Sequence, residues 1–141
     1  MKRSVRWILA VLAIVLLSFG VRKVAKSHAR RKREAGYQST LNSYSQALKP
    51  GMTRKEVENY LREKNLEFRQ MCCVDFREGQ KVPWDDLVKI GEEDAPWYCS
   101  SNNVYVVFQF TKDLQFKGMW RADDLDHLEA VTIYRSLETC L

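Results

Sequence analysis

The spacing of apolar residues changes near Asn65, a little before the middle of this chain, and that change limits the folds the chain can adopt. Before Asn65 the apolar residues recur at intervals of three and four, which is the spacing of one helical face. After Asn65 they recur at every second position, as in a strand with one buried side. Helices followed by a run of strands indicate an α+β fold.

Two short helices are expected before Asn65. Pro50-Gly51 ends the first, and the second begins at once, because Thr53 and Glu56 have the spacing of a capping box, in which each side chain binds the other's free backbone N–H. Asn65 is expected to end the second helix in a left-handed conformation. The residues with helical spacing are Leu41, Tyr44 and Leu48 in the first helix and Val57, Tyr60 and Leu61 in the second.

Four segments after Asn65 have the alternation of strands. They are Leu66–Val74, Trp84–Gly91, Asn102–Phe110 and His127–Glu138. We expect a three- to four-stranded antiparallel meander sheet with both helices packed on its apolar face. In the first segment Cys72 falls on the apolar face and Cys73 on the opposite one, while Gln70 is a polar exception on the apolar face.

An uncharged apolar run, Trp7–Val21, comes before these elements. A helix of this length covers about 22 Å, less than the ~30 Å hydrocarbon core, but Arg6 can reach outward and helical residues beyond Val21 can extend it. We predict an N-terminal membrane anchor or signal segment (1–21), a basic juxtamembrane linker (22–36) and a single α+β domain (37–141). The alternative to an uncleaved membrane helix is a cleaved signal peptide.

Basic residues are concentrated at the N-terminus. Residues 1–34 hold ten Lys and Arg against one Glu, whereas residues 35–141 hold thirteen against seventeen Asp and Glu. A mildly acidic domain lacks the basic face that nucleic acid requires, so no nucleic-acid partner is expected. The basic run Arg22–Arg33 suits anionic lipid headgroups, and the lipid bilayer is the partner expected for it and for Trp7–Val21.

The four cysteines, Cys72, Cys73, Cys99 and Cys140, allow three complete pairings. A bridge between neighbours is set aside, because Cα atoms ~3.8 Å apart are closer than the usual ~4.4–6.8 Å. We predict two disulfides, each joining one member of the adjacent pair to Cys99 or Cys140. The alternatives are buried thiols, a thiol-based redox site, or a zinc site that includes His127, although C-x-x-C spacing is missing.

Two features of the sequence give opposite predictions for the side of the membrane on which the domain lies. More Lys and Arg follow the apolar run than precede it, which would leave the domain in the cytoplasm. Disulfides would instead require an oxidising compartment. We favour a single-pass membrane protein with an extracytoplasmic domain in the bacterial periplasm, and the cytoplasmic side stays open.

Aromatic residues gather in or beside the expected connections and are candidates for a partner-binding patch. They are Trp84, Trp97, Tyr98 and Trp120. The alternative is that they cover the edge of the core. No enzyme, cofactor or metal is expected: a catalytic arrangement would depend on His127 beside Asp126, and no glycine-rich phosphate loop is present.

The segment Leu48–Asn65 contains the pattern G-M-T-x-x-E-V-x-x-x-L. It resembles the opening signature of the SmpA/OmlA (BamE-like) domains, and the whole chain resembles uncharacterised short bacterial membrane-anchored proteins. The resemblance implies a small ααβββ module of the bacterial envelope, but no cysteine follows the apolar run, so the lipid attachment site of that family is missing.

The function expected is a membrane-anchored envelope protein that acts as a non-catalytic protein-interaction or structural module, with a protein partner. One alternative is a cytoplasm-facing membrane protein with a thiol-based sensing or metal-binding role. Another is a periplasmic, inhibitor-like binder that signal cleavage releases.

Overall fold

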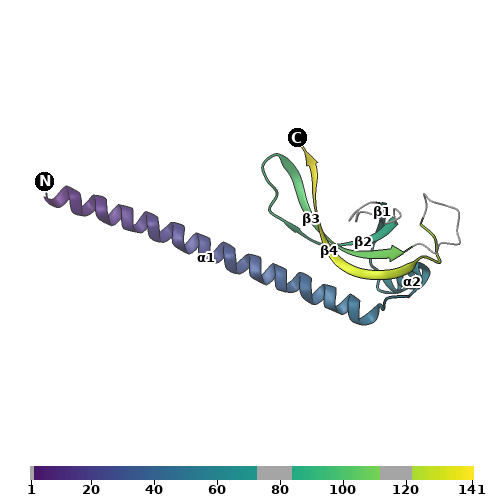
Figure 1. Cartoon of the computed structure of the whole chain (residues 1–141). Coiled ribbons are helices and arrows are strands. Elements are labelled where there is room, and N and C mark those ends of the chain that lie inside the picture. The colour runs from purple at the N-terminus through teal and green to yellow at the C-terminus, as the bar shows by residue number, and fades with distance from the viewer. Residues whose placement is uncertain (1, 73–83, 112–121) are drawn as a thin grey trace. The chain divides into compact units, whose positions relative to one another are not determined.

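The structure, a computed structural model, describes residues 2–72, 84–111 and 122–141, with the backbone alone for residues 2–6 and 8–19. Its elements are α1 (Lys2–Ala47), α2 (Arg54–Glu63), β1 (Arg69–Cys72), β2 (Trp84–Glu93), β3 (Cys99–Thr111) and β4 (His127–Cys140) (Figure 1). The chain divides into two units, Met1–Gly36 and Tyr37–Leu141. The predicted α+β class is confirmed.

The N-terminal segment and the first expected domain helix are parts of one helix, α1. The basic run Arg22–Arg33 is therefore helical, and its side chains are exposed. Among the described residues, no helix combines the length and the apolar character that crossing a membrane demands.

Helix α2 begins with the capping box. The Thr53 backbone N–H donates to Glu56 Oε2 at 2.8 Å, and the Glu56 backbone N–H donates to Thr53 Oγ1 at 3.3 Å. Val57 and Leu61 are fully buried on the inner face. Asn65 has a φ of 54°, and this left-handed residue directs the chain from α2 toward β1.

The sheet has the order β1-β2-β3-β4, with antiparallel neighbours throughout. Figure 1 shows that it curls into a half-barrel. Its main core lies on one face, against α2 and the end of α1 that belongs to the second unit. This core contains Tyr44, Leu48, Val57, Leu61, Val88, Val106, Phe108, Phe110 and Leu128. A smaller cluster on the opposite face contains Leu87, Tyr105 and Val107, with Met71 and Tyr134 beside it.

The hairpin between β2 and β3 is longer than the sequence predicts. The predicted strands Trp84–Gly91 and Asn102–Phe110 leave a loop over residues 92–101, but Glu92 pairs with Asn103 and Glu93 with Asn102, which leaves only Asp94–Tyr98 as the loop. These paired residues are all polar, and Asn103 among them is buried, so the alternation of apolar and polar residues that reveals the rest of the two strands is absent here. Cys73, Val74, Trp120 and most of the two other predicted connections lie outside the described residues.

Candidate functional site

A disulfide joins Cys99 and Cys140, which lie opposite each other where β3 begins and β4 ends. The prediction that each would bond to Cys72 or Cys73 is therefore wrong. Cys72 lies opposite Trp84 at the start of β2, whereas Cys99 follows the end of β2, so the ten residues of that strand separate them. The antiparallel pairing of β3 with β4 continues to the start of β3 and the end of β4 and brings the two distant cysteines together, and the sequence did not reveal how far that pairing extends.

The disulfide fixes the base of an exposed aromatic pair, Trp97 and Tyr98, at the tip of the β2–β3 hairpin. Trp97 is 92% exposed and Tyr98 42% exposed, and their rings meet edge to face with centroids 5.8 Å apart. The Leu141 N–H donates to the Tyr98 carbonyl at 2.8 Å, and the Cys99 N–H donates to the Pro96 carbonyl at 2.9 Å. The tip is thus held by one covalent bond and two backbone hydrogen bonds.

Acidic residues precede this tip. Glu92, Glu93 and Asp94 lie three to five residues before Trp97 in the chain. Glu92 is 3.2 Å from Lys89, and Glu93 is 3.5 Å from Arg135. A rigid apolar projection with carboxylates at its base is suited to a partner that offers an apolar pocket with a basic rim.

The structure does not bring the four predicted patch aromatics together. Trp84 is half-buried at the opposite end of β2 from the tip, and its carbonyl accepts a hydrogen bond from Arg54. Trp120 lies outside the described residues. Only Trp97 and Tyr98 form a common surface within the ranges that the structure describes.

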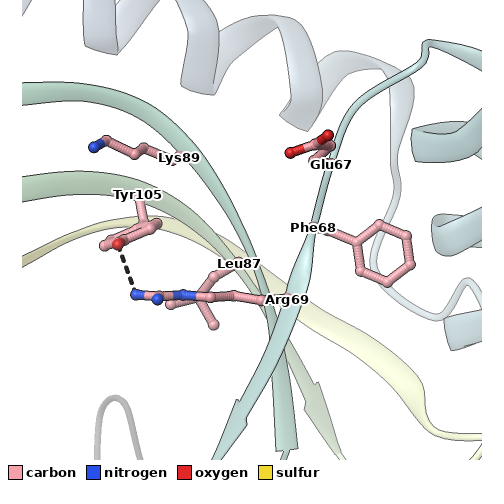
Figure 2. Close-up of a pocket in the computed structure, with 6 residues that line it drawn as sticks. All are labelled: Glu67, Phe68, Arg69, Leu87, Lys89 and Tyr105. Carbon is pink, nitrogen blue, oxygen red and sulfur yellow. Dashed lines mark hydrogen bonds between the residues drawn. The ribbon is translucent and has the colours of Figure 1, made fainter.

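A pocket of about 260 Å³ lies on the sheet face opposite the main core. The residues that line it are Glu67, Phe68, Arg69, Leu87, Lys89 and Tyr105. Figure 2 shows the Arg69 and Tyr105 side chains meeting over this face, while the Phe68 ring points the other way. Arg69 Nη2 donates to Tyr105 Oη at 2.6 Å and to Glu138 Oε1 at 3.1 Å.

The hydrogen bond from Tyr105 to Glu138 shifts the pKa values of both groups. Burial, and then the hydrogen bond that it donates to Glu138, raise the pKa of Tyr105. The same hydrogen bond from Tyr105 is the largest cause of the lowered pKa of the Glu138 carboxyl. Arg69 is already bonded to Tyr105 and Glu138, so the pocket has a weaker claim to a ligand than the uncovered hairpin tip.

A buried polar cluster lies between α2 and the sheet. Arg54 Nη1 donates to Asp86 Oδ1 at 2.7 Å, and Arg54 Nη2 lies 3.2 Å from Asp126 Oδ2. Gln70 Nε2 donates to Glu58 Oε1 at 3.0 Å at the edge of this cluster. Sequence analysis missed the cluster, although Gln70, the polar residue on an apolar strand face, was its signal.

His127 does not form a catalytic pair with Asp126. Its Nδ1 lies 3.2 Å from the Gly51 carbonyl oxygen at the surface, whereas the Asp126 carboxylate accepts from Arg54 and from the Asp123 N–H. In the part of the chain that the structure describes, no three His, Cys, Asp or Glu side chains are grouped as a metal ion would need.

Comparison of the chain with models of known protein families, with curated proteins and with solved structures finds no match.

Proposed function

We propose that this chain is a membrane-anchored protein of the bacterial envelope whose α+β domain binds another protein and performs no catalysis. The observation that carries the proposal is the Trp97–Tyr98 pair, held outward at a hairpin tip by the Cys99–Cys140 disulfide. Exposed aromatic side chains on a rigid support lose little conformational entropy on binding, so they serve as anchors at interfaces.

The partner has an apolar pocket with basic residues at its rim. The aromatic pair would fill the pocket, and the carboxylates of Glu92, Glu93 and Asp94 would face the rim. In this proposal the carboxylates of Glu92, Glu93 and Asp94 determine the specificity for the partner, and the aromatic pair supplies most of the affinity.

The anchor and the compartment are parts of the same proposal. The uncharged run Trp7–Val21 enters the bilayer, and the basic run Arg22–Arg33 meets anionic headgroups. The Cys99–Cys140 disulfide supports an oxidising compartment and therefore the periplasmic side. The motif over Leu48–Asn65 supports an envelope domain of the SmpA/OmlA (BamE-like) kind.

The test places a photo-crosslinking amino acid at position 97 or, as a matched control, at Leu125, which is 49% exposed in another loop. We expect a discrete cross-linked species in intact cells from position 97 and none from position 125. Replacing Glu93 and Asp94 by Lys should abolish that species while the domain stays folded. Equal cross-linking from both positions would refute a binding tip, and a topology reporter fused after Leu141 that is active only in the cytoplasm would refute the compartment.

A further inference from the structure

The pocket beside Tyr105 has the properties that the hairpin tip requires of its partner. Leu87 and the Tyr105 ring supply apolar surface, and two cations, Arg69 and Lys89, line the same pocket against the one carboxylate of Glu67 (Figure 2). Its volume of about 260 Å³ is below the ~300–1,000 Å³ of sites for drug-sized ligands. A single large side chain therefore suits it better than a cofactor does.

Both cations keep the capacity for a further partner. Arg69 Nη2 makes the bonds to Tyr105 and Glu138, and the guanidinium has three other N–H groups on Nε and Nη1. Its Cζ lies 4.5 Å from the centroid of the Tyr105 ring, and 46% of the Arg69 side chain is exposed, so a second aromatic ring can pack against the guanidinium. The Lys89 side chain is 49% exposed, and its ion pair with Glu92 lies at the surface, where such pairs contribute little.

We propose that the partner of the hairpin tip is a second copy of this chain, with Trp97 of each copy in the pocket of the other. This inference rests on the proposed function, because it names the partner for the same tip. The indole packs on Leu87 and against Arg69, and the carboxylates that precede the tip face the cations of the pocket. Within one chain the tip does not fill the pocket, because Trp97 is 92% exposed.

Two copies can make both contacts at once. The pocket and the tip share one hairpin, and Lys89 lies five residues before Asp94, where the loop begins, or about 16 Å along the strand. When two such hairpins lie antiparallel, the tip of each is opposite the pocket of the other, and a two-fold axis relates them. This closed pair leaves neither tip nor pocket unfilled, whereas docking in one direction alone would continue from copy to copy as a filament.

The test measures the self-association of the full chain in detergent micelles by sedimentation equilibrium. We expect a dimer for the wild type. Trp97→Ala and Lys89→Glu should each weaken association about a hundredfold, because each removes two symmetry-related contacts that contribute about tenfold apiece. The control, Lys55→Glu, makes the same charge change on an exposed residue of α2 and should dimerise as the wild type does.

A mixture of the two variants is the most specific measurement. The intact tip of the Lys89→Glu chain can enter the intact pocket of the Trp97→Ala chain, so the mixed dimer recovers one of the two contacts. It should associate about tenfold more tightly than either variant alone. A mixture no tighter than the separate variants would overturn the docking of tip into pocket. A monomeric wild type would overturn the second copy as the partner, and the proposed function would still stand if position 97 cross-links to a different protein in cells.

A second measurement decides the question if the substitutions disturb folding. The full chain with the photo-crosslinking amino acid at position 97 is mixed in micelles with isotope-labelled wild-type chain and irradiated. Mass spectrometry should place the cross-link between an unlabelled and a labelled chain, within residues 67–69 or 87–89 or at Tyr105. Cross-links that fall elsewhere on the second copy, or within one chain, would exclude this arrangement.

Discussion

Arg54 Nη1 lies 2.7 Å from Asp86 Oδ1, and at most 1% of either side chain is exposed. The same guanidinium lies over the Phe110 ring at 3.9 Å and within 3.2 Å of Asp126 Oδ2. The first residue of α2 is therefore fixed to β2, to β3 and to the segment that enters β4. A buried charge in this position sets how the helix and the sheet meet.

Above about pH 7, where Asp86 is ionised, replacing Arg54 with Met should destabilise the domain by about 3–5 kcal/mol, because Asp86 would be left as a buried carboxylate without its counter-ion. The measurement is the free energy of unfolding from denaturant titration. A double variant that also carries Asp86→Leu should recover part of the loss, since Asp86 is then no longer a buried charge, while Asp126 still lacks its contact with Arg54. A single variant within 1 kcal/mol of the wild type would contradict this account.

Stability should also depend on pH through Asp86. Burial is the largest influence on the pKa of the Asp86 carboxyl and raises it. The Arg54 charge lowers this pKa and the Glu58 charge raises it. The net result is a rise from 3.8 to about 7. Between these two values the folded chain holds a proton that the unfolded chain has released. The free energy of unfolding therefore falls as the pH rises through this range.

The contribution of Asp86 is complete below about pH 4 and lost above about pH 7. Asp86→Asn should remove this slope, and the quantity to measure is the difference between the two stability profiles. That difference separates Asp86 from Glu56 and Glu138, whose lowered pKa values act in the opposite direction at lower pH. An identical slope in both proteins would show that Asp86 does not titrate in this window.

The sequence predicted the order of elements within the domain from Tyr37 onward, because local patterns decide it, but it did not predict that α1 runs without a break from Lys2 to Ala47. The change of apolar spacing near Asn65, the capping box and the alternation in β3 each depend on neighbours within a few residues. The inner face of α2 was predicted for the same reason, and Leu61 is fully buried there.

The sequence did not predict relationships between distant segments. From the sequence, Arg54 is expected to be a surface residue at the start of a helix. Its contacts with Asp86 and Asp126, which lie in or beside the sheet, make it the centre of a buried cluster. The pairing of Cys99 with Cys140 depends on the register of β3 with β4 across 41 residues, which spacing along the chain does not determine. The distance of Trp84 from Trp97 and Tyr98 was missed for the same reason, because Trp84 lies at the other end of β2.

The inner face and the cap of α2 can be compared directly. Thr53→Ala should cost about 1 kcal/mol, because the Glu56 N–H loses its side-chain acceptor. Leu61→Ala should cost about 2–5 kcal/mol, because it opens a cavity in the main core. Thermal melts give the order, and Thr53→Ser, which keeps the hydroxyl acceptor, is the control for the cap. A reversed order would mean that the cap matters more than the core.

Removing the disulfide should loosen the tip before it unfolds the domain. Cys140→Ser opens a loop closed across 41 residues and should cost about 2–4 kcal/mol. The Leu141 N–H bond to Tyr98 lies beside the bridge, so amide hydrogen exchange should rise first around Tyr98 and Leu141, while amides in the middle of β3 stay protected. Cys72→Ser is the matched control, since Cys72 lies at the other end of β2, and it should leave exchange at the tip unchanged. If both substitutions raised exchange equally at the tip, the Cys99–Cys140 bridge would not be what holds Trp97 and Tyr98 in place.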